Sequence, residues 1–309
     1  MGGPPLALSL EGREADLEAW IRAELALRVN ELADRLPAGP GAGASRLLLD
    51  ELQGDVVGAI RRPPAAAQEA LAAVRESDGD VRRVVAVFER DPVLAQALLK
   101  RANASYYAAS RGPCESLLEA AHRIGLDGIH GVLLANTIEG LLCRPGSEYA
   151  GMVEQVWSHM VRSAPIARRV APAFGVKPEQ AFTIALLHDV GKLVLFDRLS
   201  LLRSRRRRTP ELPAGFLPAA LRRLHEPLGG VTATVWGLGA PLARAIFTHH
   251  RNPLRYAGDR LSEVACLAER VDLAGAAGRP LDLPTLWADA DLSGEPERVA
   301  ALLAEPPVG

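Results

Sequence analysis

The stretch QAFTIALLHDVGKLVL, residues 180–195, decides the fold of this chain. Pro178 stands just before it and suits the first turn of a helix, because its missing N–H would have no partner there in any case. Apolar residues then recur at helical spacing, and the polar pair His188 and Asp189 follows them. An adjacent imidazole nitrogen and carboxylate oxygen can face one divalent cation. Two ligands are too few to hold a metal, so the others must come from elsewhere, and five of the seven histidines lie in residues 159–250.

The composition is that of a folded globular protein. Of the 309 residues, 48% are hydrophobic and 24% are charged, and the length could hold a main domain plus an extension. A net charge of −1 provides no overall field that would attract nucleic acid or anionic lipid. We therefore expect neither nucleic acid nor a membrane as a partner.

The first residues and the cysteines both favour a cytoplasmic location. The beginning of the sequence lacks the basic segment and the long apolar core of a secretory signal. No uninterrupted apolar run approaches the ~18 residues of a membrane span. Cys114, Cys143 and Cys266 show no C-x-x-C spacing, so the sequence suggests neither a disulfide framework nor a zinc knuckle. A reducing cytoplasm fits this pattern best.

Two helices are predicted ahead of residue 62. In residues 13–36 the apolar side chains form one stripe, with Glu and Arg on the opposite face, at Leu17, Ile21, Leu25, Val29, Leu32 and Leu36. A Pro- and Gly-rich break follows, and Ser45 is expected to cap a second helix that extends to Ile60. The stripe needs a partner surface. It either covers the domain behind it or forms a docking arm or homodimer interface, and both alternatives stay open.

From residue 64 onward the pattern is one helix after another, and no long stretch alternates with a period of two. Asp91 is the expected N-cap of a helix that begins at Pro92, and Gly125 is expected to end another. Pro165 should bend or divide the helix expected over residues 149–174. The sequence therefore predicts an all-α fold.

Some polar residues in this region have an ordinary interpretation. His122 and His130 lack carboxylate or cysteine neighbours at ligand spacing, so we interpret them as helix-face residues. The arginine run at 203–208 could bind phosphate, but it has no interleaved aromatic side chains and is better explained as a solvated linker.

Several segments together resemble one protein family. FTIALLHDVGKLVL at 182–195 is similar to the signature of the HD superfamily, and most closely to its HDOD (HD-related output domain) group. DPVLAQALLKRANASY at 91–106 resembles a segment found in HDOD domains, and His225 precedes Trp236 by the family's spacing. The resemblance implies a multi-helix HD-like bundle at 62–273, with lobes at 62–142 and 149–273. An N-terminal helical extension at 1–61 and a tail at 274–309 flank it.

The same resemblance implies a set of metal ligands. His159, His188 and Asp189 match the family's ligands for one ion, whereas His225, His249 and His250 match additional ligands for a second. Glu269 stands where the family has a later Asp. Lys192 matches a position that approaches substrate phosphate. These residues imply a divalent metal, namely Fe, Mn, Zn or Ni.

The resemblance leads to two alternative functions. HDOD similarity implies a bacterial signal-transduction module that binds a partner protein or a nucleotide messenger, and the sequence after His250 lacks the GYP motif of cyclic-di-GMP phosphodiesterases. The alternative is a metal-dependent phosphohydrolase in which Asp189 and Lys192 are catalytic. A third interpretation needs no metal, because a buried hydrogen-bonded His-Asp network can specify a core without chemistry.

Overall fold

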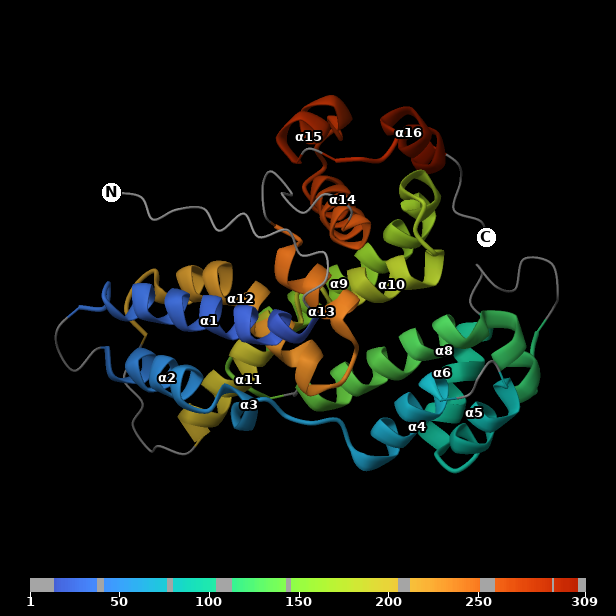
Figure 1. The fold of residues 1–309 in the computed structure, drawn as a ribbon, viewed down its shortest axis with the longest axis horizontal. Helices are drawn as coiled ribbons and strands as arrows, with labels where there is room; N and C mark the ends of the chain where they lie inside the picture. Colours follow the sequence, from blue (N-terminus) through green and yellow to red (C-terminus); the bar gives the residue numbers. More distant parts are fainter. Residues whose placement is uncertain are drawn as a thin grey trace.

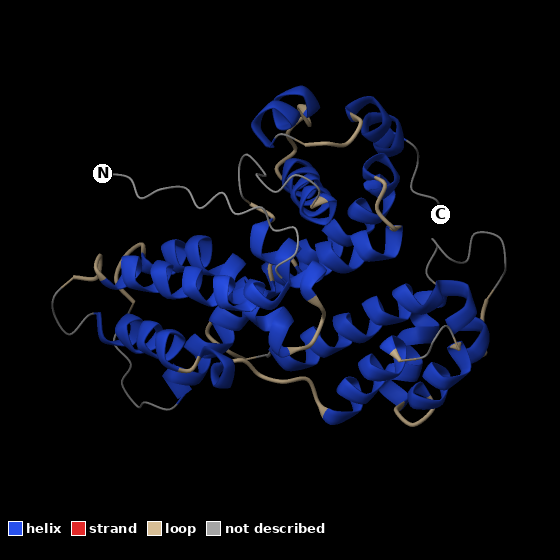
Figure 2. Ribbon diagram, viewed as in Figure 1, coloured by secondary structure: helices blue, strands red, loops and turns tan. Residues whose placement is uncertain are grey.

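Every element that the structure describes is a helix, which confirms the all-α prediction (Figures 1 and 2). The structure is a computed structural model, and it describes residues 14–37, 42–76, 80–103, 113–142, 146–204, 212–250, 259–290 and 292–304. Within these ranges, none of the helices combines the length and apolar character that crossing a bilayer requires. The segment of Ser105 and Tyr106, most of the arginine run and residues 251–258 lie outside the described ranges.

Four helices pack together at one end of the molecule (Figure 1). They are α4 (Ala65–Arg75), α5 (Val81–Phe88), α6 (Pro92–Ala102) and α8 (Leu117–Leu142), and we call them the α4–α8 group. Asp91 caps α6 by accepting hydrogen bonds from the N–H groups of Val93 and Leu94, as predicted. At Gly125 the backbone has a non-helical conformation, with φ 70° and ψ 172°. The helical stretch that begins at Leu117 therefore ends there as predicted, and a second stretch follows directly after a kink within α8.

A second set of helices carries the HD signature. It comprises α9 (Ala150–Val170), the 3-10 turn η2 (Ala171–Phe174), α10 (Pro178–Leu187), α11 (Val190–Ser204), α12 (Phe216–Val235), α13 (Ala240–Thr248) and α14 (Arg260–Ala276). Pro178 begins α10 as predicted, whereas α9 continues through Pro165 and is not divided there. α9, α10 and α14 pack against one another, and α12 packs against α11 and α13. Two short helices, α15 (Leu283–Ala290) and α16 (Pro296–Ala304), close the far side of α9 and η2.

The predicted apolar stripe from Leu17 to Leu32 belongs to α1 (Glu14–Ala33), which lies along α12 and buries these residues within the chain (Figure 1). Leu36 follows the end of α1 and is half-buried. The homodimer through these helices stays a prediction, but this burial already provides the partner surface that the stripe requires. Ser45 is not the cap of the second helix: α2 (Gly43–Gly54) begins earlier and buries Ser45 inside it. Asp55 then caps a separate short helix, α3 (Val56–Ala59).

Candidate metal centre

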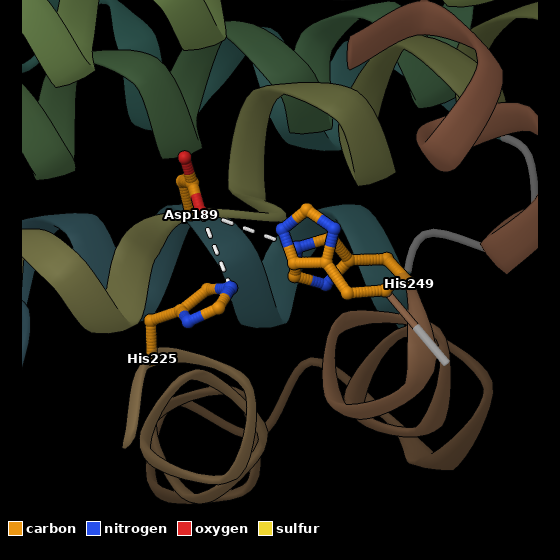
Figure 3. Close-up of side chains that lie close together, drawn as sticks. Asp189, His225 and His249 are labelled. Atoms are coloured by element: carbon orange, nitrogen blue, oxygen red, sulfur yellow. Dashed lines mark ion pairs between the residues drawn. The ribbon is translucent and has the colours of Figure 1, made fainter. Parts of the chain in front are cut away.

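His188 and Asp189 lie at the junction of α10 and α11, where both side chains are almost completely buried. Gly191, two residues after Asp189, explains how α11 approaches α12 so closely. A Cβ atom at this position would lie 2.0 Å from the carbonyl oxygen of His225 and 2.7 Å from the amide nitrogen of Gly229. The missing side chain therefore allows the two helix backbones to touch, and this contact brings Asp189 beside His225 (Figure 3).

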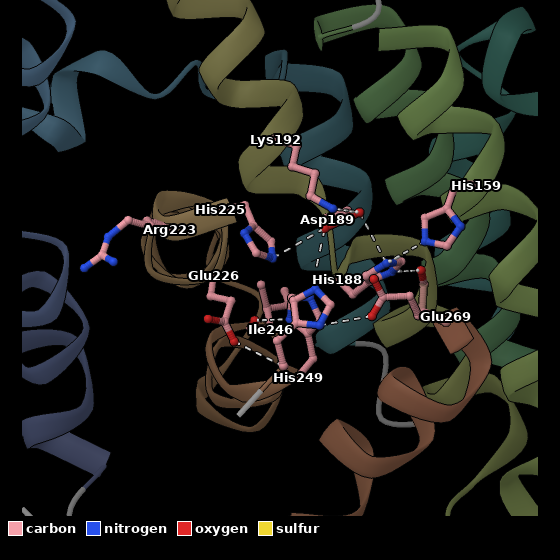
Figure 4. Close-up of polar contacts among 12 residues, drawn as sticks. His159, His188, Asp189, Lys192, Arg223, His225, Glu226, Ile246, His249 and Glu269 are labelled. Atoms are coloured by element: carbon pink, nitrogen blue, oxygen red, sulfur yellow. Dashed lines mark hydrogen bonds and ion pairs between the residues drawn. The ribbon is translucent and has the colours of Figure 1, made fainter. Parts of the chain in front are cut away.

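The seven predicted ligand residues form two groups that share Asp189 (Figure 4). In each group the potential ligand atoms, one per residue, all lie within 4.8 Å of one another. The first group consists of His159, His188, Asp189 and Glu269, and the second of Asp189, His225, His249 and His250. The structure thus gathers side chains from α9, the α10–α11 junction, α12, the end of α13 and α14 around one carboxylate. The two groups have a composition that suits divalent cations.

Hydrogen bonds on the outer side of three imidazole rings orient these rings towards the centre. In each ring the Nδ1 atom lies 2.7 Å from an oxygen. The oxygen is Asp272 Oδ2 for His159, the carbonyl oxygen of Ala185 for His188, and the carbonyl oxygen of Ile246 for His249. Each of these oxygens can only accept, so the proton of a neutral ring resides on Nδ1 and the lone pair of Nε2 points inward.

The contact between His159 and His188 bears on whether the cluster could hold a metal ion. Their Nε2 atoms face each other at 3.2 Å, although neither carries a proton when both rings are neutral. Two imidazole ligands at right angles on one cation, each about 2.1 Å from it, have nitrogens about 3.0 Å apart. The observed spacing therefore fits two ligands of one ion better than a hydrogen bond.

Several buried polar atoms in the centre have no hydrogen-bond partner, namely Asp189 Oδ1, His225 Nε2, His249 Nε2 and Glu269 Oε2. The two histidine nitrogens lie 3.7 Å and 4.0 Å from Asp189 Oδ1, too far for hydrogen bonds. Glu269 Oε2 lies 3.2 Å from His250 Nδ1 but lacks the alignment of a hydrogen bond. Unsatisfied buried polar atoms are costly, and cations held by the two groups would satisfy all four. The residues therefore fit a metal.

The electrostatics also suit metal binding. Burial lowers the pKa of His188 to about 4 and that of His225 to about 3, so both rings are neutral and able to coordinate at neutral pH. Burial alone would raise the pKa of Asp189, but His188, Lys192 and the other histidines hold it well below its usual value. Burial and the charge of Asp189 raise the pKa of Glu269 to about 8. Coordination by Glu269 at neutral pH would thus release a proton.

With this geometry in view, comparison with known proteins decides the family. The HDOD domain matches residues 60–252, more than half of the chain. The chain belongs to the HDOD domain family. An uncharacterized protein of Treponema pallidum (strain Nichols) is 24% identical over 209 residues, which are 64% of this chain and 39% of that protein.

Solved structures share the HDOD fold at low sequence identity. A provisionally named phosphohydrolase from Shewanella amazonensis SB2B has a TM-score of 0.62 at 18% identity, with coverage of 84% of this chain and 94% of the other. An HDOD domain protein of unknown function from Geobacter sulfurreducens has a TM-score of 0.51 at 19% identity, with coverage of 79% and 82%. A provisionally named signal transduction protein from Marinobacter aquaeolei VT8 has a TM-score of 0.58 at 16% identity, covering 94% of this chain and 65% of that one. These similarities show the fold alone.

Two side chains at the candidate metal centre are more exposed to solvent than the others. The side chains of His250 and Lys192 are 28% and 21% exposed, whereas the remaining ligand candidates are buried. Lys192 Nζ lies 2.6 Å from Asp189 Oδ2, so its positive charge sits at the edge of the centre. His122 and His130 lie on α8 and belong to neither ligand group, in agreement with their interpretation as helix-face residues.

Sequence reasoning did not identify Asp272, one turn after Glu269 on α14. Its Oδ2 accepts from His159 Nδ1 at 2.7 Å, and Arg162 donates to both of its oxygens at 2.8 Å and 3.0 Å. The spacing of three residues from a candidate ligand, on the same helix face, was the available signal. Asp272 therefore orients His159 from outside the ligand set.

Replacing Asp272 by alanine should weaken divalent-cation binding at the first group by about 10- to 100-fold, because outer partners of this kind fix the ring of the ligand histidine. Competition titration with manganese measures this effect. The matched control is Asp289→Ala, which removes an exposed carboxylate from α15. Equal affinities of the two variants would contradict an orienting role for Asp272.

Proposed function

We propose that this HDOD chain binds two divalent cations in the centre and hydrolyses a phosphoester. The observation that carries the proposal is the sharing of Asp189 by two complete ligand groups. When bound, such a pair of cations supplies Lewis-acid polarisation of a phosphoryl group and lowers the pKa of water. Imidazole and carboxylate donors without thiolate suit Fe, Mn, Zn or Ni.

The chain's own residues have distinct parts in this proposal. Asp189 would contribute to holding both cations, since its two oxygens face different neighbours. Its Oδ1 faces His225 and His249, and its Oδ2 faces His188 and Lys192. Lys192 provides a fixed positive charge at the more exposed edge, where an anionic phosphate would approach. The remaining candidate ligands are buried, so the centre is most accessible on the side of Lys192 and His250.

A second candidate function rests on a different feature, a cavity of about 470 Å³ between the α4–α8 group and α10, α13 and α14. Its lining is mostly aliphatic, with polar side chains from His130, Glu179, Gln180 and Thr183. A cavity of this size and character suits a small organic ligand. In this alternative the protein is a bacterial signalling module that binds a nucleotide messenger there and reports to a partner protein.

One screen separates the two functions. The full chain is loaded with manganese and incubated with bis-p-nitrophenyl phosphate, nucleotides and cyclic dinucleotides, and both product formation and binding are recorded. We expect hydrolysis of at least one phosphoester, abolished by a chelator. Tight binding of a nucleotide without turnover, unaffected by the chelator, would contradict hydrolysis and support the signalling module.

A further inference from the structure

Glu226 is a buried carboxylate that belongs to neither ligand group, although it follows His225 directly. Its Oε1 atom accepts a hydrogen bond from the backbone N–H of His250 at 3.1 Å (Figure 4). Glu226 therefore connects α12, which carries the candidate ligand His225, to the backbone of a second candidate ligand, His250. A carboxylate this deeply buried requires a positive partner, because an uncompensated buried charge is strongly unfavourable.

Arg28 of α1 is such a partner. Its Nη1 atom donates to Glu226 Oε2 at 3.1 Å and to the backbone carbonyl of Arg223 at 2.8 Å, and its Nε donates to Glu24 at 2.9 Å. The guanidinium is thus fixed by contacts on both helices. It connects α1 to the polypeptide on both sides of His225.

Two apolar contacts hold α1 against the same region. The side chain of Ile21 lies so close to Gly230 of α12 that a Cβ atom there would be 3.1 Å from it. The ring of Trp20 meets that of Phe247 edge to face, with centroids 4.5 Å apart, and Phe247 precedes His249 by two residues. The family match begins at residue 60, so α1 lies outside the matched segment.

We propose that α1 is a positioning element for the second ligand group, and that it acts through Arg28 and Glu226 on the backbone of His250. The inference rests on the proposed metal binding for its functional consequence. Its structural part, the fixing of the His249–His250 turn by α1, stands independently of any metal.

The test compares the full chain with Arg28→Met, which keeps an apolar stem and removes the charge. Arg28→Lys is the rescue variant, and Arg22→Met is the matched control, because Arg22 is exposed on the same helix and pairs with Glu18. Glu226→Gln removes the charge from the other partner, so the contact can still be tested if Arg28→Met fails to fold. Circular dichroism establishes that each variant is folded.

Two readouts are needed. In metal-free protein, we expect amide hydrogen exchange in a peptide covering residues 246–250 to accelerate in Arg28→Met and Glu226→Gln, to return towards wild type in Arg28→Lys, and to stay unchanged in Arg22→Met. In loaded protein, Arg28→Met should lower retained manganese from about two to about one equivalent, because only the second group loses its support.

The outcomes distinguish this inference from the proposed function. Unchanged exchange at 246–250 in both Arg28→Met and Glu226→Gln would overturn the positioning role. Accelerated exchange with no manganese retained by the wild-type chain would support the positioning role and contradict the metal-dependent function. Accelerated exchange with both equivalents retained by the variants would overturn the action of α1 on the ligands.

Discussion

An Asp189→Ala protein should retain neither of the two cations that we propose for the wild-type chain. The reason is geometric, since Asp189 is the one residue common to both ligand groups. Outer-sphere changes alone cost metal sites 10- to 100-fold, so loss of the shared ligand should lower both metal affinity and phosphoesterase activity by at least about 100-fold. Elemental mass spectrometry and hydrolysis of bis-p-nitrophenyl phosphate measure the two effects.

Single-group variants provide the comparison for Asp189→Ala. Glu269→Ala belongs to the first group and His250→Ala to the second, so each should lose about one equivalent of metal. Circular dichroism of the metal-free proteins controls for unfolding. If Asp189→Ala loses no more metal than either comparison variant, the carboxylate is not shared.

We expect the Gly191→Ala substitution to destabilise the protein strongly. The added methyl group would overlap the carbonyl oxygen of His225 and the amide nitrogen of Gly229, which are backbone atoms and cannot rotate away. We expect a loss of at least about 3 kcal/mol in the free energy of unfolding, the upper end of ordinary overpacking costs. Metal retention should fall as well, because separating α11 from α12 separates Asp189 from His225.

Gly151→Ala is the matched control for this prediction. It also places a methyl group on a helix, but at an exposed position of α9 where a Cβ atom meets nothing within 4 Å. Its stability should equal or slightly exceed that of the wild type, since alanine favours the helix. Urea denaturation of the metal-free proteins gives both values. Similar midpoints for the two variants would contradict the close helix contact at Gly191.

Particular residues show which parts of this architecture a sequence can predict. The apolar stripe of α1 could be predicted, because helical periodicity of apolar residues indicates a buried helix face without identifying the element that covers it. The packing of α1 against α12 could not be predicted, since nothing in residues 14–33 identifies a helix some 200 residues later as the partner. The prediction for Ser45 was wrong because a favourable capping residue can equally be buried inside a helix, where tertiary packing overrides local preference.

The candidate ligands were predictable for a different reason. Motif and order in the chain assembled the set from His159 to Glu269, and the structure brings all seven residues together. The replacement of the family's Asp by Glu at 269 does not remove this carboxylate from the first group. The sequence did not predict Asp272 and Glu226, because they form hydrogen bonds to candidate ligand residues. Such contacts depend on the three-dimensional structure and cannot be inferred from sequence spacing.

Metal content decides whether the two ligand groups hold two divalent cations. The most direct measurement is the metal content per chain of untagged protein loaded anaerobically with manganese and freed of excess metal, by elemental mass spectrometry. We expect about two equivalents per chain, because a pair of sites with a shared carboxylate binds two cations. Retention of no manganese, with iron, zinc and nickel also failing to bind, would contradict it and leave the histidine cluster as part of the core.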